Sequence, residues 1–224
     1  MSIPNPISIP TPHIAHLTEE DYEHVYEPAE DSFILLDALE IDAQLIRDDQ
    51  PTVCVEVGSG SGIASTFLTQ LIGHGSSLVL STDINRYACE VTQRTAKANQ
   101  ITLNPIQCNL LGPLSARLKG KIDILLFNPP YVPTDLEELN DTQQLRDIGG
   151  AWAGGDNGMI ITDIVLNQLP DLLSPTGKMY LVTIIQNKPL DIAQRMQSKG
   201  LLCKEIIRRR AGRELLSVLR ISRK

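Results

Sequence analysis

Residues 52–72 contain an apolar strand, a glycine-rich loop and a helix in direct succession. Thr52–Val57 is mostly apolar and β-branched, which is typical of a strand covered on both faces. The loop Gly58-Ser59-Gly60-Ser61-Gly62 follows without a gap, and Ile63–Ile72 has the apolar content of a helix. Because parallel strands of α/β proteins lie between two layers of helices, this succession favours an α/β fold with a mainly parallel sheet.

Strands and helices alternate along the rest of the chain. The other expected strands are Ser77–Thr82, Pro105–Cys108, Ile122–Phe127, Lys178–Ile185, Leu202–Arg208 and Leu215–Ile221, and the other expected helices are Glu30–Ile46, Arg86–Asn99, Met159–Leu173 and Pro189–Ser198. The short connection that contains Gly212 predicts that the last two strands are antiparallel. The glycine-rich, partly acidic segment Pro133–Gly158 is long for a plain connection, so we expect a functional loop there.

The length of 224 residues fits one domain. We assign this domain to residues 22–224 and expect residues 1–21, which contain several prolines, to form a flexible extension. The net charge of −7 argues against a protein that binds duplex DNA by neutralising many phosphates. An aromatic content of 4 % is low for stacking on single-stranded nucleic acid, so we expect no direct nucleic-acid binding.

The four cysteines are scattered and form no CxxC pair, which predicts a reducing compartment and no metal site. The sequence shows neither a signal peptide nor an apolar stretch of about 18 residues. We therefore expect no membrane segment and a cytoplasmic protein, with the nucleus as a second location.

A tetrapeptide, Asn128-Pro129-Pro130-Tyr131, follows the expected strand Ile122–Phe127 directly. The Asn128 side-chain oxygen and the Pro129 carbonyl can each accept one N–H of a planar NH2 group, and the two prolines stiffen the backbone between them. The Tyr131 ring can pack on the face of that group. The tetrapeptide therefore predicts a site for an amide or a base amine, although Asn-Pro is also a common turn signal.

Three earlier strand ends carry residues that suit a nucleoside ligand. Gly58 opens a loop that lets a ligand approach the backbone, and Glu56 before it would repel a pyrophosphate and suit a cation. Asp83 can accept both hydroxyls of a ribose, and Asn109-Leu110 can contact an adenine. A ribose, an adenine and a positive centre without phosphates describe S-adenosyl-L-methionine. Since ligands of α/β sheets bind at the carboxyl ends of strands, we expect Asn128 to adjoin this cofactor too.

These motifs resemble those of the class I S-adenosylmethionine-dependent methyltransferases with an Asn-Pro-Pro-Tyr motif. Within that group, the chain resembles the eukaryotic HemK-like release-factor glutamine methyltransferases, catalytic subunit, over roughly residues 22–222. The segments that carry this closer resemblance are Val25–Phe33, with its Tyr-Glu-Pro-Ala-Glu-Asp block, Ala151–Gly155 and Ala211–Val218. The resemblance implies a Rossmann-like, seven-stranded, mostly parallel sheet whose last strand is antiparallel.

The resemblance also implies an activity and partners. The implied activity is methylation of the glutamine side-chain nitrogen in the Gly-Gly-Gln motif of the class I release factor. The implied partners are a small zinc-binding activator protein, which forms a heterodimer with the catalytic subunit, and the release factor, together with its GTPase partner. Ser32, Glu56, Gly58, Asp83 and Leu110 match cofactor positions of the family. Asn109 departs from the aspartate that relatives usually carry, so the adenine contact would lose its charge.

In this reading Asn128, Pro129 and Tyr131 are catalytic, and Pro130 adds to the substrate site. Two alternatives stay open at this point. One is an adenine-N6 methyltransferase on nucleic acid, because adenine also presents a planar NH2 group, and the other is a lysine methyltransferase on another protein. No general base is identifiable, and Glu27 and Glu30 are candidates to close over the cofactor.

Overall fold

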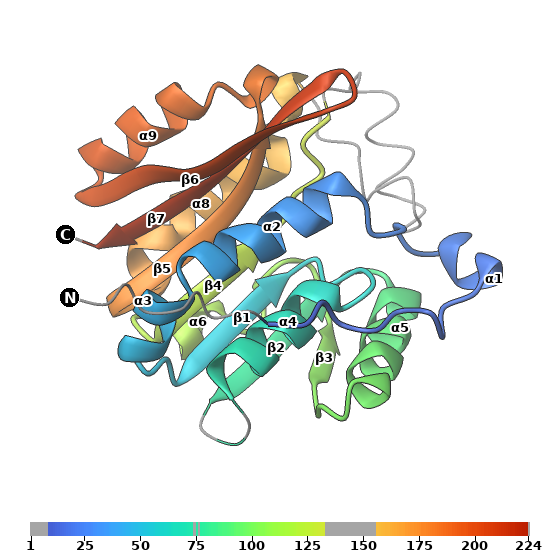
Figure 1. Cartoon of the computed structure of the whole chain (residues 1–224). Coiled ribbons are helices and arrows are strands. Elements are labelled where there is room, and N and C mark those ends of the chain that lie inside the picture. Colours follow the sequence, from blue (N-terminus) through green and yellow to red (C-terminus); the bar gives the residue numbers. More distant parts are fainter. Residues whose placement is uncertain (1–8, 74, 76, 133–155, 224) are drawn as a thin grey trace, which may run out of the picture.

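The computed structural model describes residues 9–73, 75, 77–132 and 156–223 (Figure 1). Within them, a seven-stranded sheet has the order β3-β2-β1-β4-β5-β7-β6. The strands are β1 Val53–Val57, β2 Leu78–Asp83, β3 Asn104–Gln107, β4 Ile122–Phe127, β5 Leu173–Ile184, β6 Leu201–Ala211 and β7 Glu214–Arg223. Strands β1 to β5 pair in parallel, and β7 is antiparallel to both β5 and β6. The predicted sheet, including its antiparallel last strand, is confirmed.

Helices cover both faces of this sheet, and Figure 1 shows α2 in front of the strands with α8 behind them. The helices are α1 Glu19–Tyr22, α2 Glu30–Ile41, α3 Ala43–Asp48, α4 Ile63–Ile72, α5 Arg86–Ala98, α6 Ser115–Leu118, α8 Ile160–Leu172 and α9 Pro189–Ser198, with short 3-10 turns η2 Asp156–Gly158 and η3 Ile185–Asn187. None of the helices in the described part of the chain is long and apolar enough to cross a membrane.

Alternate residues of the central strands enter two separate cores. On β4, Ile124 and Leu126 pack in the core that α2 and α4 cover, while Leu125 and Phe127 pack in the core that α8 and α9 cover. All four side chains are buried because both faces are covered, which explains why the part of this strand after Asp123 is continuously apolar. Because both faces of the strand are buried, its register in the sheet is fixed, and so is the position of the tetrapeptide that follows it.

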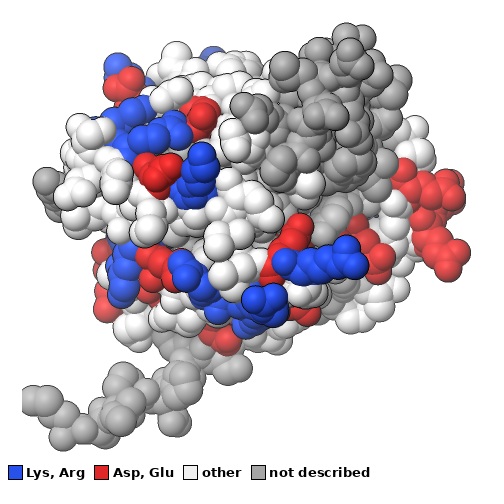
Figure 2. Space-filling model, turned by 90° about the horizontal axis from the view of Figure 1, so that it is seen from above, with Lys and Arg blue, Asp and Glu red and all other residues white. Residues whose placement is uncertain are grey.

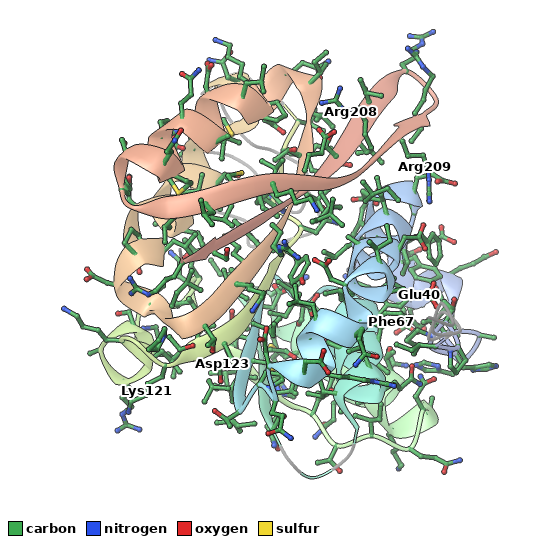
Figure 3. All side chains as sticks on the ribbon, turned by 60° about the vertical axis from the view of Figure 1, so that its left-hand side comes forward. Glu40, Phe67, Lys121, Asp123, Arg208 and Arg209 are labelled. Atoms are coloured by element: carbon green, nitrogen blue, oxygen red, sulfur yellow. The ribbon has the colours of Figure 1, made fainter. Side chains whose placement is uncertain are left out.

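The expected helix Glu30–Ile46 is divided at Asp42, where α2 ends and α3 begins. The Asp42 carboxylate accepts hydrogen bonds from Tyr180 Oη at 3.0 Å and Arg220 Nη1 at 2.7 Å. A second ion pair joins Asp37 of α2 to Arg209 of β6. Figure 3 shows Arg209 at the end of β6 that lies nearest α2. These contacts attach α2 to β5, β6 and β7, and a tertiary contact of this kind outweighs local helix propensity.

Strand β5 begins earlier than expected, at Leu173. Ser174–Gly177, which separate the expected helix Met159–Leu173 from the expected strand, lie inside β5 as an irregularity, because Ile122 pairs with Leu173 whereas Ile124 pairs with Lys178. A side chain at Gly177 would lie 2.4 Å from the Ile122 carbonyl oxygen, so the close approach of the two strands requires glycine there.

Between residues 13 and 24 the chain runs along α5 before it enters α2. The His13 backbone is hydrogen-bonded to Asn99 at one end of α5, and the His24 carbonyl accepts a hydrogen bond from Asn85 at the other. Leu17 and Val25 pack with Ala88 and Val91, and Asp21 pairs with Arg94. The expected flexibility of residues 1–21 and their separation from the domain at residue 22 stay predictions. The greater part of the expected loop Pro133–Gly158 lies outside the described residues.

Candidate active site

A cavity of about 880 Å³ lies at the carboxyl ends of β1, β2 and β4. All of the predicted site residues line it: Ser32, Glu56, Gly58, Asp83, Asn109, Leu110, Asn128, Pro129, Pro130 and Tyr131. Strand ends far apart in the sequence meet here because parallel strands place their carboxyl ends on one edge of the sheet. The volume is within the usual range for a site that binds a small molecule.

The glycine loop forms an open wall of the cavity. Gly58 and Gly60 have φ of +73° and +49°, and a Cβ at either position would meet no atom within 4 Å. Gly62 has a different reason, because its Cβ would lie 2.7 Å from the Thr92 Cα. The first two glycines therefore leave room for a ligand against the backbone, whereas the third allows α4 to pack closely on α5.

Glu56 lies at the bottom of this wall and is 6 % exposed. It accepts hydrogen bonds from the backbone N–H of Ser65, at 3.0 Å, and from the Ser65 hydroxyl. Burial raises the pKa of Glu56 to about 8, against the lowering effect of these hydrogen bonds. A carboxyl group in this environment gains most from a ligand that brings a positive charge.

Asp83 ends β2 beside the same loop. Its Oδ2 accepts the Gly60 N–H at 3.0 Å, and its Oδ1 accepts the Asn85 N–H at 2.9 Å. Burial raises the pKa of Asp83, and the backbone hydrogen bonds oppose that shift. Since each carboxylate oxygen can accept a second hydrogen bond, the group can still take two hydroxyls of a ribose.

Asn109 and Leu110 follow β3 at the other end of this wall. Asn109 is exposed, and Leu110 has a φ of +49°, which is uncommon for a residue with a side chain. Such strained residues cluster at ligand sites, and both residues border the cavity where an adenine would lie next to a ribose on Asp83.

Asn128 carries the most informative contact of the site. Its Nδ2 donates to Asp31 Oδ2 at 2.8 Å. Its Oδ1 is buried and has no hydrogen-bond partner among the described residues. A buried acceptor without a donor costs about 1–3 kcal/mol, so it is uncommon outside functional sites. The arrangement leaves an acceptor for an N–H group of a ligand.

Asp31 is a residue that the motifs did not single out. It is 5 % exposed and lines the cavity, whereas the candidates Glu27 and Glu30 are exposed and do not line it. Its only signal in the sequence was its place in the Tyr-Glu-Pro-Ala-Glu-Asp block. The contact with Asn128 joins residues 97 positions apart, which spacing in the sequence does not reveal.

Tyr131 is 8 % exposed at the end of the tetrapeptide. Burial raises the pKa of its hydroxyl, and the charges of Asp31 and Glu214 raise it further, so the ring stays neutral. Its carbonyl oxygen accepts a hydrogen bond from Asn187 Nδ2 at 2.9 Å, a second contact that the sequence did not predict. Asn187 therefore fixes the backbone of the tetrapeptide from the end of β5.

The N-terminal wall of the cavity is formed by His24, Val25 and Tyr26. The His24 ring stacks on Tyr87 with centroids 4.2 Å apart, and Asn85 Nδ2 donates to the His24 carbonyl at 2.7 Å. The N-terminal segment is thus attached to the start of α5, next to Asp83. Among the described residues, no group of three His, Cys, Asp or Glu side chains is arranged to hold a metal ion.

Comparisons with known proteins agree with this geometry. The model of the family "Methyltransferase small domain" matches residues 32–146. The chain is 45 % identical to "Methyltransferase HEMK2" of Mus musculus, over 96 % of this chain and 98 % of that protein. It is 41 % identical to "eRF1 methyltransferase catalytic subunit mtq2" of Schizosaccharomyces pombe, over 95 % of each chain.

A solved structure shares the fold at low identity. The E. cuniculi Mtq2–Trm112 complex, described as methylating the translation termination factor eRF1, aligns with a TM-score of 0.65 and 24 % identity, over 89 % of this chain and 99 % of that one. The residues around the cavity fit S-adenosylmethionine, with an open glycine loop, a buried acid for a cation and an acid for a ribose. The chain therefore belongs to the class I S-adenosylmethionine-dependent methyltransferases, in their eukaryotic HemK-like branch of catalytic subunits.

Proposed function

We propose that this chain transfers the methyl group of S-adenosylmethionine to the side-chain nitrogen of the glutamine in the Gly-Gly-Gln motif of the eukaryotic class I release factor. The observation that carries the chemistry is the buried Oδ1 of Asn128, a residue that lines the cavity; this oxygen has no hydrogen-bond partner in the described part of the chain. The named activity of the Schizosaccharomyces pombe relative supports the choice of the release factor.

When bound, S-adenosylmethionine supplies an electrophilic methyl group on a sulfonium. The protein has to orient a weak nucleophile, because the lone pair of an amide nitrogen is delocalised. Asn128 Oδ1 and the Pro129 carbonyl would each accept one N–H of the glutamine, which turns the nitrogen lone pair towards the methyl group. Both acceptors also stabilise the positive charge that develops on the nitrogen during transfer. Orientation alone can contribute several kcal/mol, up to roughly 7 or more in ideal cases.

The roles assigned to the cofactor residues follow from their positions. Asp83 accepts the ribose hydroxyls, Asn109 and Leu110 contact the adenine, and Gly58 admits the ligand to the backbone. Glu56 and Ser32 lie at the methionine end, where Glu56 attracts the cationic groups. Asn128 borders this end as well, which brings the methyl donor and the acceptor amide to the same point of the cavity.

Cofactor binding is expected to depend on pH through Glu56. The pKa of about 8 means that this carboxyl is mostly protonated at neutral pH in the free protein. A bound cation favours the carboxylate, so binding should release protons, and affinity should rise between about pH 6 and pH 8 and then level off. Calorimetry in two buffers of different ionisation enthalpy measures the released protons.

The matched variant is Glu56→Gln, which keeps the shape of the side chain but cannot titrate. It should bind S-adenosylmethionine more weakly and release no protons from this site.

The free energy of unfolding changes with pH in the direction opposite to the cofactor affinity. The pKa of Glu56 is 4.5 in the unfolded chain and about 8 in the fold, so stability without cofactor should decrease as the pH rises between these values. An affinity for S-adenosylmethionine that falls between about pH 6 and pH 8 would contradict the assignment of Glu56 to the cationic groups of the cofactor.

The proposal includes partners. A small zinc-binding activator protein would bind the catalytic subunit as a heterodimer, and the E. cuniculi complex supports such a partner. The zinc would belong to the activator. The release factor would be presented together with its GTPase partner, in the cytoplasm and, as a second location, the nucleus.

The nucleic-acid alternative gains nothing from the charges of the surface. Several arginines of β6 and β7 are paired with acids: Arg208 with Glu205, Arg209 with Asp37, and Arg220 with Asp42. Figure 2 shows Lys and Arg side chains interspersed with Asp and Glu on the face that it presents. A lysine acceptor has a flexible ammonium group, which does not require two acceptors in one plane.

The deciding experiment incubates the chain and the activator with S-adenosylmethionine and one of three acceptors. We expect the release factor to gain one methyl group, which tandem mass spectrometry places on the glutamine of Gly-Gly-Gln. A release factor with that glutamine changed to alanine is the matched control and should gain none. Methylation of a DNA or RNA adenine, or of a lysine of another protein, in place of the glutamine would overturn the proposal.

A further inference from the structure

We infer that Asp31 is the positioning residue that decides which end of the Asn128 amide is offered to the substrate. This inference rests on the proposed methyl transfer to an amide nitrogen. An asparagine side chain has a donor end and an acceptor end of nearly the same shape, and rotation by half a turn exchanges them. Only the acceptor end can receive the N–H of a glutamine.

The contact between the two residues selects one orientation. Asp31 Oδ2 lies 2.8 Å from Asn128 Nδ2, and a carboxylate accepts hydrogen bonds without donating. The reversed amide would place two acceptor oxygens against each other inside the protein. Asp31 therefore takes the NH2 end of Asn128 and leaves Oδ1 without a partner among the described residues.

Asp31 is itself held in place by donors from Tyr26 and Ser32. Its Oδ1 accepts the Tyr26 hydroxyl at 3.2 Å, the Ser32 N–H at 2.8 Å and, more weakly, the Ser32 hydroxyl at 3.5 Å. All of these contacts are made through Oδ1, so Oδ2 is the oxygen directed to Asn128. Tyr26, Asp31 and Asn128 thus form a chain of hydrogen bonds from the N-terminal wall to the tetrapeptide, and every step has a fixed donor and acceptor.

The fixed polarity also determines which side chains the site accepts. A glutamine brings two N–H donors, one for the available oxygen of Asn128 and one for the Pro129 carbonyl, whereas a glutamate of the same shape brings only acceptors when ionised. A carboxylate substrate would face Asn128 Oδ1 and, close behind it, the Asp31 charge. Rejection of an analogue that leaves buried polar groups unpaired is much stronger than rejection by shape alone.

Exchanging the two residues tests this role. Asp31→Asn keeps the size of the side chain but presents an NH2 group to Asn128, so the Asn128 amide should turn and offer a donor to the substrate. We expect kcat with the activator and release factor to fall by about 10²-fold, with KM for S-adenosylmethionine within about threefold of wild type. The kcat of Asn128→Asp should fall by a similar factor, because two carboxylates would then face each other.

The double variant D31N/N128D restores the hydrogen bond in the opposite sense. The amide introduced at position 31 can donate to one oxygen of the carboxylate introduced at position 128, and the other oxygen of that carboxylate can again accept an N–H of glutamine. We therefore expect kcat at least about tenfold above either single variant, which is a coupling that independent residues do not show. Asp48→Asn is the control, because this exposed residue of α3 accepts a hydrogen bond from Gln44 and does not line the cavity. It should retain wild-type KM values and kcat.

A merely structural role for Asp31 predicts additive losses, so a double variant less active than both single variants would overturn the inference. Tyr26→Phe supplies a second measurement that leaves the buried charge in place. It removes one donor to Asp31 and should lower kcat severalfold, whereas unchanged kcat would argue against the hydrogen-bond chain. If the wild-type complex does not methylate the release factor, the proposed function fails instead, and the two results are distinct.

Discussion

Replacing Asn128 with alanine is expected to lower kcat for methyl transfer by roughly 10²- to 10³-fold, the effect typical of removing one hydrogen-bonding group that stabilises a transition state. The substitution deletes the acceptor that holds the glutamine NH2 group and that interacts with the charge developing on nitrogen. It leaves Glu56, Asp83 and the glycine loop unchanged. Affinity for S-adenosylmethionine should therefore stay within about threefold of wild type, because the interaction is made mainly in the transition state.

The same substitution should have little effect on the free energy of unfolding. Among the described residues the Asn128 side chain makes one hydrogen bond, to Asp31, and carries one buried oxygen without a partner. Alanine removes this hydrogen bond to a carboxylate, worth about 1.5–3 kcal/mol, together with an unsatisfied acceptor that costs about 1–3 kcal/mol, so the two effects largely offset each other. Loss of turnover with an unchanged melting temperature and unchanged cofactor affinity would locate the defect in catalysis.

Asn128→Asp is not a neutral control for this variant, since it adds a charge beside Asp31. The appropriate control is a surface asparagine such as Asn167, whose Oδ1 accepts a hydrogen bond from exposed Lys199. Asn167→Ala should retain the wild-type kcat. Turnover by Asn128→Ala at the wild-type rate would remove Asn128 from the catalytic role.

The second large effect is expected for cofactor binding in Asp83→Ala. A hydrogen bond to a charged group contributes about 1.5–3 kcal/mol, and two ribose hydroxyls can use this carboxylate, so affinity should fall by about 10²-fold or more. The Gly60 and Asn85 N–H groups also lose their acceptor. Part of the loss would therefore come from displacement of the glycine loop.

Binding of adenosine separates the assignment of Asp83 from that of Glu56. Adenosine contains the ribose but neither cationic group, so Asp83→Ala should weaken adenosine and S-adenosylmethionine alike. Glu56→Gln should weaken S-adenosylmethionine alone. Calorimetry gives both affinities, and an unchanged affinity of Asp83→Ala for either ligand would exclude Asp83 from the ribose site.

The sequence was most informative where a single strand end determines a position. The glycine loop and Asn128 directly follow β1 and β4, Asp83 is the last residue of β2, and Asn109 lies two residues after β3. In a parallel sheet these ends meet at one edge, so order along the chain is enough to bring them together. The mostly apolar strands β1 and β4 were recognisable because both faces of the sheet are covered by helices.

Long-range contacts were not accessible in this way. The hydrogen bond from Asn128 to Asp31 depends on how α2 lies across the sheet, and Asn187 reaches Tyr131 from the end of β5. The division of the helix at Asp42 likewise depends on Arg220 and Tyr180, far along the chain. Local propensity carries no information on such partners, which explains why the sequence suggested Glu27 and Glu30 for the site and not Asp31.

The attachment of α2 to β5, β6 and β7 has a consequence for the accuracy of the active site. Asp31 lies in the first turn of α2, and Asp42 follows its last residue, a separation of about 16 Å along the axis of a helix. A hydrogen-bonded helix resists extension, so a movement at one end is transmitted to the other. The ion pairs of Asp37 and Asp42 hold α2 in place, and they therefore also help to position Asp31 and the Asn128 oxygen that Asp31 orients. Natural variation at these positions, far from any ligand, would be constrained by turnover as well as by stability.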